Sequence, residues 1–123
     1  MGVEYSEAFK RQLKRLSRRY RQIKNDIKPI VDALIDGETP GDQITGTAYT
    51  LYKVRAKNSD SQRGKSGGYR VIYYLKTKTK CILVTLYSKS DQGDIASDEL
   101  KHLLSEIEKD IKGYTTFVFT KDM

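Results

Sequence analysis

The chain has 123 residues, a mass of 14.1 kDa and a formal net charge of +7, with 37% hydrophobic and 32% charged residues. These values predict a single folded domain over residues 1–123 and exclude wholesale disorder, and no apolar run approaches the length of a membrane span. The N-terminal sequence is not typical of a secretory signal, and the lone cysteine, Cys81, excludes an intrachain disulfide and fits a reducing cytoplasm. The positive charge predicts a phosphate-bearing or acidic partner, and no membrane partner is expected.

The N-terminal third is predicted to form a short strand at 3–5 followed by two helices. Ser6 is a candidate N-cap, and Gly37 is a candidate helix stop. Pro29 should break or kink the helical pattern, so the two helices should meet between about Tyr20 and Asp26. The pattern itself is a series of apolar residues spaced by three and four, which indicates an amphipathic helix: Phe9, Leu13, Leu16, Tyr20, Ile23, Ile27, Ile30 and Leu34.

The rest of the chain predicts a turn-rich connection at 37–48 and strands at about 49–57, 68–77 and 80–88. Ser97 should cap a last helix that ends at Gly113. The segment 114–120 is β-like, and we expect either an added edge strand or a flexible tail there.

This order predicts an α+β fold, with an N-terminal helical pair and a C-terminal helix packed on a mostly antiparallel four-stranded sheet. The helices should cover one face and leave the other open to a partner. Strict alternation places Lys53 with Arg55 on one face of their strand, and Arg70 with Ile72 on one face of the next. In the third strand, alternation places two site candidates, Tyr87 and Lys89, on the side of Cys81, Leu83 and Thr85.

Cations repeated inside β-branched and aromatic strands suggest a sheet face that receives a polyanion. The alternatives are that Lys53 and Arg55 protect an edge strand and that Arg70 forms a structural ion pair. The first helix is strongly basic, which is typical either of a solvated face or of a surface that contacts RNA or an acidic partner. With one histidine and one cysteine we expect no metal site, and RGKSGG lacks the spacing of a nucleotide-binding loop, so no cofactor is predicted.

Five segments together resemble the RelE/ParE superfamily of bacterial toxins, most closely its RelE/HigB-like branch, over roughly residues 3–108. They are FKRQLKRLSRRY, GETPGDQITG, LYKVRAKN, RGKSGGYRVIYYLK and ILVTLYSKSDQGDI. The resemblance implies a RelE-like fold with helices on a four-stranded antiparallel sheet. It also implies a ribosome-dependent mRNA endoribonuclease (an mRNA interferase) that inhibits translation in the cytoplasm. The implied partners are the ribosome, mRNA and a cognate antitoxin protein.

The catalytic basic residues of the family map onto Lys53, Arg55 and Arg70. Some members add a late arginine and a tyrosine, where this chain has Lys89-Ser90-Asp91 and, near the second position, Ala96. Members of the HigB type place Asp, Tyr or His near the C-terminus, which makes Tyr87 and Asp91 catalytic candidates, and Lys89, at the place of the late arginine, is the remaining one. The candidates for RNA and ribosome binding are Lys10, Arg11, Lys14, Arg15, Arg18, Arg19, Arg63 and Lys65.

Metal-independent RNA cleavage uses the 2′-hydroxyl as nucleophile and needs a base, an acid and positive charge at the phosphorane oxygens. Arg55 and Arg70 suit the phosphate, because a guanidinium contacts two phosphate oxygens at once. Lys53 is a candidate base if neighbouring cations favour its neutral form. Two alternatives stay open: a non-enzymatic gyrase inhibitor of the ParE type, which would need no basic catalytic set, and an inactive RNA-binding module.

Overall fold

One five-stranded sheet lies at the centre of the computed structural model, which describes residues 1–61 and 67–122, with side chains up to residue 109. The strands are β1 (Gly2–Tyr5), β2 (Asp42–Ile44), β3 (Leu51–Ala56), β4 (Tyr69–Thr77) and β5 (Lys80–Ser88), in the spatial order β1-β5-β4-β3-β2. Neighbours are antiparallel except for the parallel pair β1 and β5. The predicted α+β class is confirmed, with one strand more than expected. The addition is β2, whose three residues are too few for alternation to reveal inside a turn-rich segment.

The first two helices, α1 (Glu7–Arg19) and α2 (Ile23–Ile35), begin and end where the sequence signals predict. The hydroxyl oxygen of Ser6 caps α1 by accepting a hydrogen bond from the backbone N–H of Phe9 at 3.1 Å. Gly37 follows α2 with a φ of 89°, which a glycine adopts without strain. The helices are separated within the predicted region, and Pro29 lies inside α2.

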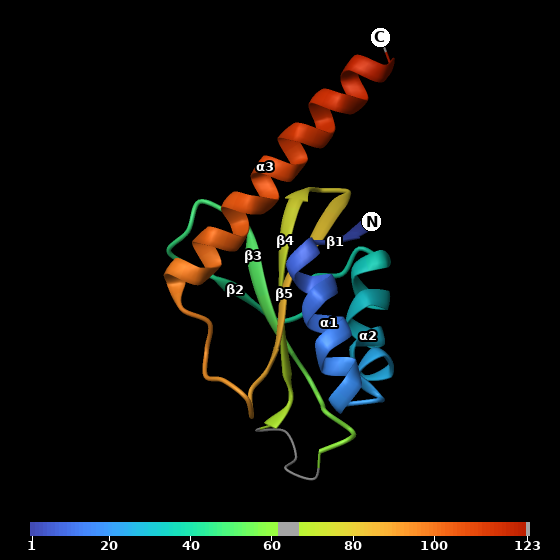
Figure 1. Ribbon diagram of the computed structural model, residues 1–123, viewed down its shortest axis with the longest axis vertical. Helices are drawn as coiled ribbons and strands as arrows, with labels where there is room; N and C mark the ends of the chain where they lie inside the picture. The colour runs from blue at the N-terminus through green and yellow to red at the C-terminus, as the bar shows by residue number, and fades with distance from the viewer. Residues whose placement is uncertain (62–66, 123) are drawn as a thin grey trace.

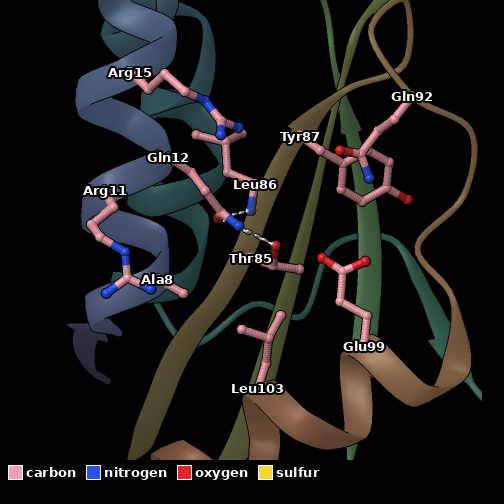
Figure 2. A pocket seen from close by; sticks show the side chains of 10 residues that line it. All are labelled: Ala8, Arg11, Gln12, Arg15, Thr85, Leu86, Tyr87, Gln92, Glu99 and Leu103. Atoms are coloured by element: carbon pink, nitrogen blue, oxygen red, sulfur yellow. Dashed lines mark hydrogen bonds between the residues drawn. The ribbon is translucent and has the colours of Figure 1, made fainter.

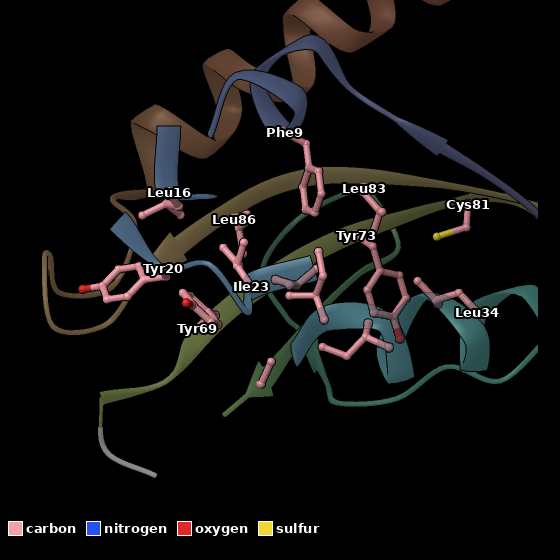
Figure 3. Packing of buried hydrophobic residues seen from close by; sticks show 14 residues of the cluster. Phe9, Leu16, Tyr20, Ile23, Leu34, Tyr69, Tyr73, Cys81, Leu83 and Leu86 are labelled. Atoms are coloured by element: carbon pink, nitrogen blue, oxygen red, sulfur yellow. The ribbon is translucent and has the colours of Figure 1, made fainter. Parts of the chain in front are cut away.

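Helices cover both faces of the sheet, so the expectation of one fully open face is wrong (Figure 1). β4 and β5 carry apolar side chains on both faces, and each apolar face requires a cover. On one face, α1 and α2 pack against the strands in a cluster that we call the α1/α2 cluster (Figure 3); it includes Phe9, Leu16, Ile23, Leu34, Tyr69, Val71, Tyr73, Cys81, Leu83 and Leu86. On the other, α3 (Ser97–Asp122) contributes to the α3 cluster, which comprises Leu51, Ile72, Ile82, Val84, Tyr87, Leu104 and Ile107.

The last helix continues beyond its predicted end at Gly113 and runs to Asp122. The backbone of the segment 114–120 is therefore helical, and the edge strand considered there is wrong. A single glycine inside a helix costs only about 1 kcal/mol relative to alanine, so it does not by itself stop the helix. Figure 1 shows the C-terminal part of α3 extending past the end of the sheet. Within the described part of the chain, none of the helices combines the length and apolarity that a membrane crossing needs.

Candidate active site

Two arginines lie directly opposite each other at the centre of the site. Arg55 of β3 and Arg70 of β4 are register partners, on the face of the sheet that carries the α3 cluster. The backbone approaches closely beside this pair. A side chain at Gly68 would collide with the backbone carbonyl of Ala56, so only glycine fits there. Like charges in directly opposed positions destabilise a sheet, so stability alone does not explain this pair.

Arg70 is buried, with an exposed fraction of 4%. Its guanidinium donates a hydrogen bond to the carbonyl of Tyr69 at 3.2 Å. Among the residues whose side chains are described, no carboxylate forms an ion pair with Arg70 or with the exposed Arg55. A buried charge without a partner costs several kcal/mol, whereas a bound anion would neutralise it. The structural ion pair considered for Arg70 is therefore absent from the described residues.

Two lysines converge on one carboxylate beside the arginines. Asp94, in the loop between β5 and α3, lies 3.5 Å from the Nζ of Lys53 and 3.1 Å from the Nζ of Lys89. The hydrogen bond from Lys89 and the charge of Lys53 lower the pKa of Asp94. Lys53 must leave this ion pair before it can act as the base considered for it. The sequence analysis missed Asp94, because nothing in the loop sequence distinguishes it from Asp91.

The position of Lys53 argues against a purely edge-protecting role. β3 lies between β2 and β4, and Lys53 pairs with Asp42 on one side and Ile72 on the other. β2 begins at Asp42 and runs antiparallel to β3, away from Arg55. Arg55 therefore lies on a part of β3 that β2 does not cover. The edge interpretation therefore loses support for Lys53 and remains open for Arg55.

Tyr87 faces the site, although strict alternation predicts the opposite side. It pairs with Arg70 and belongs to the α3 cluster, whereas Cys81 and Leu83 belong to the α1/α2 cluster. Its hydroxyl forms no hydrogen bond of normal geometry with the residues that the structure describes. Burial raises the pKa of Tyr87, and the nearby backbone of Ile95 and the charge of Arg70 only partly oppose this rise. Tyr87 therefore stays protonated at neutral pH and can donate a proton or a hydrogen bond.

Asp91 does not join this group, because its carboxylate accepts a hydrogen bond from Arg19 at 2.7 Å. This ion pair connects the end of α1 with the turn after β5. The structure thus brings together Lys53, Lys89 and Asp94, with Tyr87 beside Arg70 and Arg55.

The predicted cations of α1 are all exposed. Lys10 pairs with Glu7, and Arg19 with Asp91. Four others form no ion pair with any described residue: Arg11, Lys14, Arg15 and Arg18. Arg63 and Lys65, the remaining candidates for RNA binding, lie outside the described residues.

A cavity of about 490 Å³ lies between the basic helix α1 and Tyr87 (Figure 2). Arg11, Gln12 and Arg15 of α1 form one wall, Tyr87 contributes from β5, and Glu99 from the first turn of α3. Arg11 and Arg15 therefore line the same cavity as Tyr87.

A comparison of the sequence with known protein families identifies the family of this chain. The profile of the RelE toxin of the RelE / RelB toxin-antitoxin system matches residues 5–118. This match spans nearly all of the described fold, including every residue of the site. The chain belongs to the RelE family of toxins.

Proposed function

We propose that the protein is a ribosome-dependent endoribonuclease that cleaves mRNA in the cytoplasm and so inhibits translation. RelE-family toxins are generally endoribonucleases that inhibit translation. The observation that carries the proposal for this chain is the opposed pair of Arg55 and Arg70, which has no carboxylate partner among the described residues. A phosphodiester would supply the missing negative charge.

In this mechanism Arg55 and Arg70 bind the non-bridging oxygens of the scissile phosphate. The 2′-hydroxyl of the preceding nucleotide gives its proton to water and attacks phosphorus, the bond to the 5′ oxygen breaks, and a 2′,3′-cyclic phosphate forms. The guanidinium groups stabilise the charge that develops on the phosphorane. Tyr87, held in its protonated form, donates to the departing 5′ oxygen. Lys53 and Lys89 add positive charge once phosphate displaces the carboxylate of Asp94.

Dependence on the ribosome follows from what this site offers. Its described groups are basic side chains, a protonated tyrosine and the carboxylate of Asp94, whose lowered pKa makes it a weak base. Such a site gains most if the RNA is already held in a geometry suited to attack. The unpaired cations on α1 suit phosphates of ribosomal RNA, through contacts that depend on salt but not on sequence.

The antitoxin implied by the family should bind through acidic residues. The net charge of +7 and the unpaired cations on α1 and in the site favour an acidic segment that folds on binding and covers the helices or the cavity.

The test is primer extension on a defined mRNA in a purified translation system, with and without ribosomes. A second mRNA carries one 2′-deoxynucleotide immediately before the mapped cut. The proposal predicts discrete cuts only with ribosomes, and loss of that one cut in the substituted mRNA. Intact mRNA would contradict the nuclease; inhibited DNA supercoiling by gyrase would then favour a ParE-type inhibitor, and RNA binding without cleavage an inactive module.

A further inference from the structure

An irregularity in β5 decides which side chains face the site. In the first half of the strand, Leu83 belongs to the α1/α2 cluster and Val84 to the α3 cluster. Regular alternation from there would place Tyr87 in the α1/α2 cluster, away from Arg70. Instead Leu86 lies in that cluster, and Tyr87 lies in the α3 cluster.

A β-bulge causes this reversal. Thr85 pairs with Ile72 and Leu83 pairs with Tyr73, so Val84 is an extra residue on β5 with no partner of its own on β4. One inserted residue exchanges the faces of all residues that follow it. Tyr87 therefore reaches the site only because the bulge is present.

The bulge lies where β5 no longer pairs with β1. β1 pairs with β5 only as far as Leu83, and the outer edge beyond that point faces α1. The side chain of Gln12 occupies this edge: its Oε1 accepts from the backbone N–H of Leu86 at 2.8 Å, and its Nε2 donates to the hydroxyl of Thr85 at 2.9 Å (Figure 2). Thr85 is only 1% exposed, so these hydrogen bonds have little competition from water.

We propose that Gln12 is a positioning residue for the nuclease, which holds the bulge and thereby keeps Tyr87 beside Arg70; this role rests on the proposed function. Glutamine suits the task because one amide group supplies both the acceptor for Leu86 and the donor for Thr85. A helix-borne side chain here replaces the hydrogen bonding that an adjacent strand would otherwise give. Without it, the buried hydrogen-bonding groups of Thr85 and Leu86 lose their partner, and the bulge loses its constraint.

The test compares Gln12→Met, which keeps the shape but not the hydrogen bonds, with Gln12→Glu. The glutamate still accepts from the Leu86 N–H and from the Thr85 hydroxyl, so Gln12→Glu should keep most of the activity. On ribosome-bound mRNA, Gln12→Met should lower the single-turnover cleavage rate about 10–100-fold and leave ribosome affinity unchanged. Ile30→Val, a mildly destabilising change in the core under α2, is the control for reduced stability and should cleave at the wild-type rate.

A double-mutant cycle with Tyr87→Phe shows whether Gln12 acts through Tyr87. If it does, Gln12→Met should reduce cleavage far less in the Tyr87→Phe background than in the wild type. Equal losses in both backgrounds would overturn the proposal.

Two readouts do not need activity. In Gln12→Met, the Leu86 amide should lose protection from hydrogen exchange, and the Tyr87 ring should lose NOEs to the aliphatic side chains of the α3 cluster. Unchanged exchange and NOEs would overturn the role of Gln12 while leaving the nuclease standing, as would wild-type cleavage by Gln12→Met. A wild-type protein that cuts no RNA would overturn both proposals.

Discussion

Arg55 and Arg70 are placed where function and stability conflict. They are register partners with the same charge, and Arg70 is buried, without a carboxylate partner among the residues whose side chains are described. Replacing a buried charge that lacks a partner with an apolar side chain of similar length is often stabilising. The conflict is typical of binding sites, where a protein retains an unfavourable arrangement because the ligand completes it.

We therefore expect Arg70→Met to raise the free energy of unfolding by about 1 kcal/mol while abolishing RNA cleavage. Urea denaturation and a cleavage assay on the same preparation measure the two effects. Arg21→Met, at an exposed arginine between α1 and α2, is the matched control and should change neither stability nor cleavage appreciably. A marked loss of stability in Arg70→Met would show that its guanidinium has a structural partner.

Asp94 pairs with the two lysines of the site, Lys53 and Lys89, when RNA is absent. Asp94→Asn should free Lys53 and Lys89, so it should tighten binding of single-stranded RNA and steepen the decrease of affinity with salt. Asp32→Asn changes the net charge equally but lies on α2, paired with Lys28 at 2.7 Å. Filter binding over a range of salt concentrations should separate the two variants. Equal behaviour would mean that Asp94 affects RNA only through net charge.

The helix α1 has two chemically different faces. Its apolar side packs on the sheet through Phe9 and Leu16, and its cations are exposed. Gln12 lies between these faces and reaches the edge of β5. The helix thus connects the proposed ribosome-binding surface to the strand that carries Tyr87.

Removing three unpaired cations of α1 should weaken ribosome binding and flatten its salt dependence. The variant is Lys14→Gln, Arg15→Gln and Arg18→Gln. Each phosphate that a cation no longer neutralises should reduce the slope of log affinity against log salt by about 0.7–0.9. The control removes the same charge elsewhere, with Lys24→Gln, Lys76→Gln and Lys78→Gln. If both triple variants bind ribosomes equally well, α1 is simply a solvated face.

Local signals predicted α1, α2 and the long strands because each depends on neighbours in sequence. The Ser6 cap, the apolar spacing in α1 and α2, and the Gly37 stop all act within one turn of helix. β2 was missed because it has only three residues, and the β5 bulge depends on more distant partners, on β4 and on Gln12 of α1. Alternation within β5 alone therefore placed Tyr87 on the wrong face.

For the site, sequence reasoning named the strand cations Lys53, Arg55, Arg70 and Lys89, and the register now shows which of them are neighbours. It did not find Asp94 or Gln12. Aspartates are common in loops, and a glutamine among the basic residues of α1 gives no signal in sequence. Their relevance arises only from the fold, which brings Gln12 to the edge of β5 and Asp94 to Lys53 and Lys89.

At the scale of the whole molecule, two clusters on opposite faces share one sheet, and ionisable side chains are buried in both. Burial raises the pKa of Cys81 from 9.0 to about 12 and also raises that of Tyr69, Tyr73 and Tyr87. Above about pH 9 the unfolded chain loses protons that the folded protein retains. Stability therefore decreases as pH rises through this range.

Between about pH 7 and 8.5 these groups should leave the free energy of unfolding nearly constant. At higher pH it should fall by up to about 1.4 kcal/mol per pH unit for each group that titrates in the unfolded chain. Urea denaturation at a series of pH values measures this. Cys81→Ala should be less stable at neutral pH but should lose stability less steeply between about pH 9 and 10, where the thiol is the first group to titrate. Stability that rises across this interval would contradict the burial of the thiol.

The most direct test of RNA cleavage at the Arg55–Arg70 pair is primer extension on ribosome-bound mRNA, comparing the wild-type protein with folded Arg70→Met. We predict discrete cuts with the wild-type protein and none with the variant, although the variant binds ribosomes as tightly through its unchanged α1. Cuts of equal strength with both proteins would contradict the assignment of the catalytic site.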